Sequence, residues 1–150
     1  MNSLNLLLVD DEEQFLTTAK KLMDKRGLNT FVCTNGFDAL RILKERRIDV
    51  VLLDLKMPGI GGVDVLRKIK QNHPGVEVIL LTGHASVESA VEGLKVGAFD
   101  YLLKPSTIPD ILDKVKEAYD RKLAKEEKAR KSKVDKIIRH PLAIYDKDEE

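Results

Sequence analysis

Five short apolar runs, separated by segments of helical period, constrain the fold of this 150-residue chain more than any other feature. Each run has the length of a buried strand, and in the segments between them apolar residues recur at i, i+3 and i+4. The expected strands cover residues 4–9, 29–33, 48–53, 76–81 and 98–103. The expected helices cover residues 12–26, 36–46, 63–70 and 86–96, and a last helix begins at Ile108. Five βα units predict an α/β fold with a doubly wound parallel sheet and helices on both faces, for which right-handed crossovers leave only a few strand orders.

Polar residues follow four of the five expected strands. The polar residues are Asp10, Asp11 and Glu12 after the first strand, Asp54 after the third, Thr82 after the fourth and Lys104 after the fifth; Gly83 and Pro105 follow the last two. In open parallel sheets the ligand crevice lies at the carboxyl ends of the strands. We therefore expect these side chains to meet at one edge of the sheet.

Three carboxylates at one edge favour a bound cation. Two carboxylates about 4 Å apart repel by ~1 kcal/mol in water and ~4 kcal/mol at an effective dielectric constant near 20. Asp10, Asp11 and Asp54 offer the oxygen ligands that Mg²⁺ prefers. A magnesium site beside a rigidly held carboxylate suits phosphoryl transfer, with Asp54 as the nucleophile. Lys104 would supply positive charge at the transferring group, and Thr82 a hydrogen bond to a phosphate oxygen.

Each of these residues also has a purely structural interpretation. Asp10 and Asp11 before a helix are typical of a cap and an acidic first turn, and Thr82 could cap the helix that follows it. Lys104 could simply begin a loop. The joint pattern at four strand ends favours a functional site over capping.

Composition and charge indicate in which cellular compartment the protein is expected and which classes of partner it is expected to bind. Cys33 is the only cysteine, so an internal disulfide is impossible and a reducing compartment is expected. No apolar run approaches the ~20 residues that span a bilayer, and the N-terminus lacks the pattern of a signal peptide, so we expect a cytoplasmic protein with no membrane partner. Residues 1–120 carry 16 Lys/Arg against 18 Asp/Glu, so no direct nucleic-acid binding by residues 1–122 is expected.

The strand-end motifs resemble those of the receiver domain of two-component response regulators, nearest in motif to receivers of the nitrogen-regulator type. The resemblance covers residues 4 to about 122. It rests on LLVDDE (7–12), VVLLDLKMPGIGG (50–62), LLTGHA (80–85) and GAFDYLLKP (97–105). It implies a flavodoxin-like sheet in the order 2-1-3-4-5.

The resemblance also implies the chemistry of the site. It implies that Asp54 accepts a phosphoryl group from a sensor histidine kinase in a magnesium-dependent reaction, without the domain being an enzyme in the ordinary sense. Asp10, Asp11, Asp54 and the backbone carbonyl of Lys56 are the implied Mg²⁺ ligands. Lys104 is implied to contact the phosphoryl group.

A conformational switch is implied as well. Thr82 follows the phosphoryl oxygens, and Tyr101 turns inward as Thr82 moves. The surface of residues 86–122 is then the output face, and a homodimer could form through it. The resemblance further implies that the peptide bond between Lys104 and Pro105 is cis.

The C-terminal segment is not covered by the resemblance. The apolar stripe of the last helix consists of Ile108, Ile111, Leu112, Val115, Ala118, Tyr119 and Leu123. We divide the chain into a receiver domain, residues 1–122, and a charged extension, residues 123–150, which is a helical linker or tail. Three interpretations remain open: a stand-alone regulator that acts by protein binding, a receiver from a longer DNA-binding transcription regulator, or an oligomerisation helix that uses Val134, Ile137 and Ile138.

Two other classes of protein fit less well. A phosphatase of the haloacid-dehalogenase type also uses an aspartate nucleophile with magnesium, but its D-x-D pattern belongs to the first strand, where this chain has Asp10-Asp11-Glu12. A nucleotide-binding protein would carry a glycine-rich phosphate loop after the first strand, which is absent from this sequence.

Overall fold

The computed structural model describes residues 4–57, 59–83 and 87–139, in which strands and helices alternate along the chain. The strands are β1 (Asn5–Val9), β2 (Asn29–Cys33), β3 (Val50–Asp54), β4 (Glu77–Thr82) and β5 (Asp100–Leu103). The helices are α1 (Glu13–Lys25), α2 (Gly36–Glu45), α3 (Gly62–Asn72), α4 (Val87–Val96) and α5 (Ile108–Arg139). All strands are parallel in the order β2-β1-β3-β4-β5, which confirms the predicted fold class.

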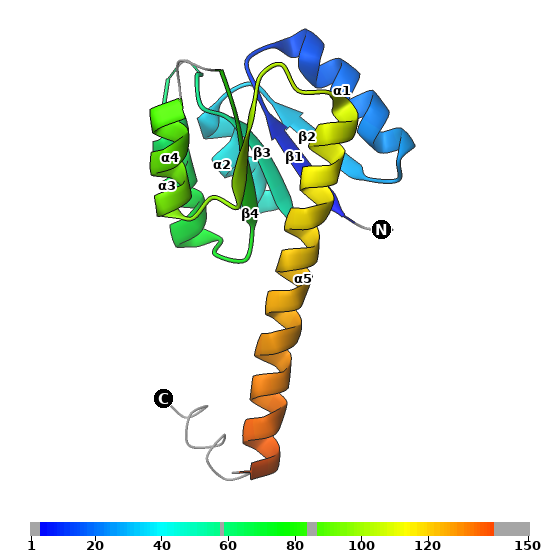
Figure 1. Ribbon diagram of the computed structural model, residues 1–150, viewed down its shortest axis with the longest axis vertical. Helices are drawn as coiled ribbons and strands as arrows, with labels where there is room; N and C mark the ends of the chain where they lie inside the picture. The colour runs from blue at the N-terminus through cyan, green and yellow to red at the C-terminus, as the bar shows by residue number, and fades with distance from the viewer. Residues whose placement is uncertain (1–3, 58, 84–86, 140–150) are drawn as a thin grey trace.

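The sheet has one hydrophobic core on each face because successive strand residues point to opposite sides. Leu7 and Val9 of β1 belong to the core that α2, α3 and α4 cover. Leu6 and Leu8 belong to the opposite core, which α1 and α5 cover (Figure 1). Helices therefore lie on both faces, and the three interior strands β1, β3 and β4 are buried from both sides.

β3 is the strand that most directly positions the candidate site. All five of its residues are buried, and β1 and β4 flank it. The sequence predicted a strand over 48–53, whereas the observed strand runs from Val50 to Asp54. Asp54 is thus part of the hydrogen-bonded strand itself. The predicted start of the fourth helix at Ser86 lies outside the described residues.

The apolar stripe predicted for the last helix is wrong at its end. Leu123 is 43% exposed, whereas its neighbour Lys122 is only 8% exposed. Lys122 is turned toward the sheet, where its Nζ lies 3.8 Å from Asp49 Oδ1 and pairs with Glu126. The hydrophobic pattern could not reveal this because a buried charge, and not an apolar side chain, occupies the position.

α5 continues as a single helix for 32 residues and projects beyond the sheet (Figure 1). Every residue from Leu123 to Arg139 is exposed. No helix in the described part of the chain is both long enough and apolar enough to cross a bilayer. The extension is therefore a solvated helix as far as Arg139.

Gly62 allows α3 to begin close to the chain that leaves β3. A Cβ atom at this position would lie 2.7 Å from the Cα of Leu55, a backbone atom that cannot move aside independently. The first turn of α3 and the segment after Asp54 are thus in direct contact. A side chain at Gly62 would push this segment away from the site.

We predict that Gly62→Ala lowers the free energy of unfolding by about 1–3 kcal/mol, as measured by urea titration, because the new methyl group overlaps the Leu55 backbone. Gly75→Ala is the matched control, since a Cβ there meets no atom within 4 Å. It should leave stability unchanged or slightly higher. Equal losses in the two variants would contradict the close packing at Gly62.

Candidate functional site

Three carboxylates meet at the carboxyl edge of the sheet. Asp10 follows β1 and Asp54 ends β3, and these two strands are neighbours. One carboxylate oxygen from each of Asp10, Asp11 and Asp54 lies within 4.8 Å of the others. Asp10 and Asp54 are 1% and 4% exposed, whereas Asp11 is exposed. The predicted convergence of these acids is therefore present, with one of them open to solvent.

The two buried aspartates use one oxygen each to shape their loops. Asp10 Oδ1 accepts a hydrogen bond of 2.9 Å from the backbone N–H of Glu12, and Asp54 Oδ1 accepts one of 3.1 Å from that of Lys56. Both bonds are of the type by which Asp stabilises a turn. The structural interpretation and the functional one are therefore compatible, because the second oxygen of each carboxylate takes no part in its turn.

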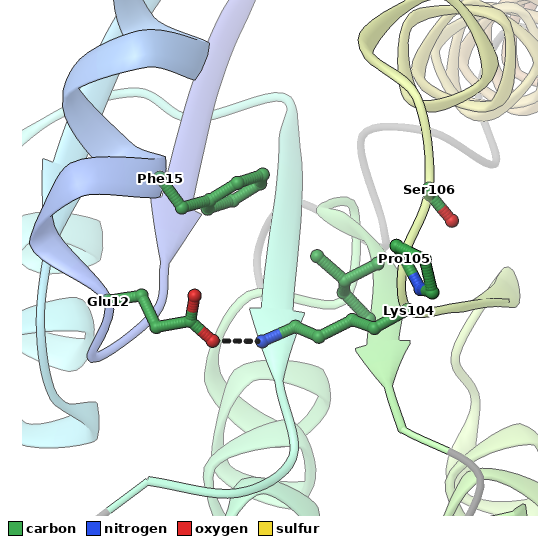
Figure 2. A pocket seen from close by; sticks show the side chains of 6 residues that line it. Glu12, Phe15, Lys104, Pro105 and Ser106 are labelled. Carbon is green, nitrogen blue, oxygen red and sulfur yellow. Dashed lines mark hydrogen bonds and ion pairs between the residues drawn. The ribbon is translucent and has the colours of Figure 1, made fainter.

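Lys104 is the cation that these second oxygens share. Its Nζ lies 3.1 Å from Asp10 Oδ2 and 3.4 Å from Asp54 Oδ2. It also lies 3.4 Å from Glu12 Oε1, as the dashed line in Figure 2 shows. The peptide bond from Lys104 to Pro105 is cis. One ammonium thus faces three carboxylates, since Glu12 joins the pair of buried aspartates.

The electrostatic environment shifts the pKa values of both partners. Burial, together with the nearby charge of Asp10, raises the pKa of the Asp54 carboxyl. The hydrogen bond from the Lys56 N–H and the charge of Lys104 partly offset this rise in pKa. Burial alone would lower the pKa of the Lys104 ammonium, but Asp10, Asp54 and Glu12 together raise it above its ordinary value. The surroundings therefore stabilise the charged form of Lys104 and destabilise the charged form of Asp54.

The donor set fits a hard divalent cation. Asp10 Oδ2 is buried and, although it lies within ion-pair distance of Lys104, makes no hydrogen bond. A buried carboxylate oxygen without a hydrogen bond is costly unless a cation compensates it. Three carboxylate oxygens within 4.8 Å of one another are ligands of the kind that Mg²⁺ takes. The residues present thus fit a magnesium ion.

Thr82 makes no side-chain hydrogen bond to this cluster among the described residues. It is the last residue of β4 and follows Leu81, which pairs with Asp54 across the sheet. Its Oγ1 donates to the carbonyl of Gly83 at 3.2 Å, and its own carbonyl accepts from the N–H of Lys104 at 2.7 Å. The hydroxyl is therefore one strand away from the carboxylate, engaged only in a local bond.

Tyr101 lies farther from the acids, in β5. It pairs with Leu80 of β4 and is partly buried against the core beneath α2, α3 and α4. Lys56 contributes its N–H to Asp54, and the role of its carbonyl as a metal ligand stays a prediction.

A pocket of about 390 Å³ opens beside the acidic cluster. Figure 2 shows Glu12 and Phe15 on one side and Lys104, Pro105 and Ser106 on the other. Phe15 belongs to the expected helix 12–26, whose apolar period does not predict a position at this rim. No periodicity could have revealed it, because a residue at the first turn of α1 satisfies the stripe and borders the pocket at once.

Comparison with known proteins agrees with this geometry. Residues 6–116 match the family model described as the response regulator receiver domain. An NtrX-like response regulator of Rickettsia felis is 36% identical over 137 residues, which cover 89% of this chain and 29% of that protein. The transcriptional regulatory protein ZraR of Escherichia coli O157:H7 is 38% identical over 104 residues, which cover 69% of this chain and 24% of that protein. The chain thus spans less than a third of the length of these two relatives.

Solved structures share the fold over most of the chain. A response regulator receiver domain protein from Clostridium thermocellum superposes with a TM-score of 0.77 at 38% identity, covering 81% of this chain and 98% of that one. NtrX from Brucella abortus, in complex with ADP, superposes with a TM-score of 0.80 at 26% identity, covering 85% of this chain and 29% of that one.

We predict that Asp54→Asn raises the free energy of unfolding at pH 7 without divalent cations by about 1 kcal/mol, or roughly 3 °C in Tm, because it removes part of the repulsion with Asp10. A carboxyl whose pKa is raised on folding contributes stability at low pH and loses it as pH rises through the folded-state pKa. The gain over the wild type should therefore shrink on acidification toward pH 4.

Lys104→Gln is the opposite test, because it leaves Asp10 and Asp54 without their shared cation. It should lower Tm at pH 7, and adding Asp54→Asn should restore part of the loss. Thermal unfolding with and without 10 mM MgCl₂ measures both effects. A loss of stability in Asp54→Asn that is independent of pH would contradict the electrostatic origin.

Proposed function

The chain belongs to the response regulator receiver domain family, and we propose that Asp54 is the residue at which it takes a phosphoryl group from a sensor histidine kinase. The observation that carries the proposal is the setting of this carboxylate. Asp54 is held at the end of a fully buried strand, 3.4 Å from Lys104 and beside two further acids. A nucleophile fixed in this way needs little reorganisation before it reacts.

In the proposed reaction an oxygen of Asp54 forms a bond to phosphorus while the bond from phosphorus to the kinase's imidazole nitrogen breaks. The imidazole nitrogen keeps the electron pair of the broken bond, and the product on this chain is an acyl phosphate. The hydrogen bond from the Lys56 N–H to Asp54 Oδ1 fixes the plane of the carboxylate. The chain is thus a phosphoacceptor signalling domain that assists its own phosphorylation and dephosphorylation.

Charge compensation comes from the surrounding residues. Mg²⁺, held by Asp10, Asp11, Asp54 and the Lys56 carbonyl, supplies positive charge against the phosphoryl oxygens when it is bound. Lys104 pairs with Asp54 and exchanges this partner for a phosphoryl oxygen. The pocket that Lys104 lines with Glu12 and Phe15 borders the residue that pairs with Asp54.

The signal would pass from Asp54 through Thr82 to Tyr101. Phosphorylation adds about −1.5 to −2 charge and new acceptor oxygens. The Thr82 hydroxyl, whose bond to Gly83 is local, can turn to donate to one of them, and Tyr101 then moves further into the space that Thr82 leaves. Reversing a two-state equilibrium from 1:99 to 99:1 requires ~5.5 kcal/mol, which is the order that charge-assisted hydrogen bonds and a buried ring supply together.

The output would be the surface of residues 86–122. Val91 and Leu94 of α4 are 43% and 36% exposed there, which suits an interface between two copies. We propose a division of the chain into a receiver, residues 1–122, and a charged C-terminal extension, residues 123–150, that serves as a linker or tail. The similarity to longer regulators favours a receiver that controls further domains, and no observation favours the alternative of a stand-alone regulator.

We predict that the wild-type protein takes up one phosphoryl group per chain from acetyl phosphate in MgCl₂, and that Asp54→Asn takes up none. Intact-mass spectrometry measures the label. Asp64→Asn is the matched control, because Asp64 is an exposed acid of α3 whose one ion pair among the described residues is with Arg67. Label on Asp54→Asn, or continuous turnover of a phosphate ester without a stable label, would point to another acceptor or to a phosphatase.

The magnesium requirement is tested in the same assay. Asp11→Asn should raise the MgCl₂ concentration at half-maximal labelling about tenfold, because it removes one carboxylate of the cluster. Excess EDTA should stop labelling of the wild-type protein. Labelling that is unaffected by either change would exclude a metal role for this cluster.

We further predict that beryllofluoride with MgCl₂ shifts the full chain from monomer toward dimer in analytical ultracentrifugation. Val91→Asp should prevent the shift because it places a charge on the proposed interface. Phe37→Asp is the matched control, since Phe37 is 65% exposed at the start of α2, away from that face. A shift that survives Val91→Asp would place the interface elsewhere.

A further inference from the structure

The helical arm, residues 121–139, has a charge opposite to that of the domain from which it projects. It contains nine Lys/Arg against three Asp/Glu, whereas residues 1–120 contain 16 against 18. Residues 140–150 add one Lys against four acids, so the segment from 121 onward still carries a net positive charge. A charge separation of this size along one chain is the electrostatic footprint of a polyanion-binding surface.

Five of the nine positive charges of the arm form a row along one side of the helix. With 3.6 residues per turn, Arg121, Lys125, Lys128, Lys136 and Arg139 fall within a sector of roughly 80°, and Ser132 fills the gap in the row. The row is about 27 Å long at 1.5 Å rise per residue. Within the groups Arg121–Lys125–Lys128 and Lys136–Arg139, successive charges are about 4.5–6 Å apart along the axis, less than the ~8 Å Debye length at physiological salt, so their potentials add. The two groups are separated by about 12 Å, between Lys128 and Lys136.

The base of the row is fixed to the domain by buried acids. Glu77, 2% exposed at the start of β4, lies 3.2 Å from Arg121 Nε and 3.8 Å from Lys125 Nζ. Lys122 lies 3.8 Å from Asp49 at the start of β3. These contacts hold the direction in which the arm leaves the sheet. The rest of the row therefore stands clear of the acidic domain (Figure 1).

Beyond the base, the cations of the row are available to a partner. Lys128 and Lys136 make no ion pair with another residue of the described chain, and both are exposed. Arg130, outside the row, pairs with Glu127. The charge in the row is thus not neutralised within the helix.

We propose that the arm is a docking surface for the phosphate backbone of duplex DNA, bound without sequence preference. A duplex carries one negative charge per ~1.7 Å of its axis, so a straight row of cations of this length meets several phosphates at once. An anionic membrane or a second copy of the arm fits less well, because both need a continuous apolar face. Residues 124–133 contain no apolar side chain larger than alanine, which interrupts the face between Leu123 and Val134.

The test is fluorescence anisotropy of the full chain with a labelled 24-base-pair duplex, in two unrelated sequences, between 50 and 200 mM NaCl. We expect both duplexes to bind equally, with micromolar Kd at 50 mM salt and a plot of log K against log salt with a slope of about −4. The variant Lys128→Gln/Lys136→Gln/Arg139→Gln should weaken binding at least tenfold at 50 mM salt. Its slope should be smaller in magnitude by about 2 to 3.

The matched control is Lys21→Gln/Lys68→Gln/Lys116→Gln, which removes three exposed lysines of the domain and the same net charge. It should change Kd less than twofold. Equal losses in the two variants would show a net-charge effect and overturn the proposal. Binding to phosphatidylserine vesicles without binding to either duplex would overturn it in favour of a membrane, and a slope near zero would exclude a phosphate-backbone contact.

Discussion

The repulsion between Asp10 and Asp54 is the interaction on which the site depends. The parallel pairing of β1 with β3 places the two carboxylates at the same edge, and burial on both faces prevents either from turning away into water. Lys104 is the one cation within ion-pair distance of both in the described residues. The repulsion at this site is only partly compensated, because a single positive charge faces more than one negative charge. Further positive charge, such as that of a bound metal ion, offsets this excess of negative charge.

Much of this arrangement could be predicted from the sequence because two strong patterns coincide. The alternation of strand and helix periods fixes the parallel sheet, and a parallel sheet brings the residues after its strands to one edge. Asp10, Asp54 and Lys104 could therefore be placed together without knowledge of a single contact. What the sequence could not supply was Glu12 as a third partner of Lys104, since an acid in the first residues before a helix is equally explained by helix capping.

The burial of Lys122 in the middle of α5 was harder to predict for a different physical reason. Hydrophobic periodicity assumes that the side of a helix facing the core is apolar, and this holds for Ile111, Val115 and Ala118. One turn later the helix passes the amino edge of the sheet, where Asp49 and Glu77 are buried. Lys122 is buried there because it meets a negative charge, so polarity and burial are no longer opposed. A pattern of apolar residues contains no information about such a pair.

The two edges of the same sheet show why buried acids alone do not identify a functional site. At the amino edge, Glu77 is surrounded by Lys70, Arg121 and Lys125, and Asp49 accepts a hydrogen bond of 2.9 Å from the Asn5 N–H besides its contact with Lys122. There the cations outnumber the acids, and the result is a fixed attachment of α5. At the carboxyl edge the acids outnumber the cations. The balance of charge around a buried carboxylate, and not its burial, thus separates a structural ion pair from a place where a cation and a phosphoryl group can bind.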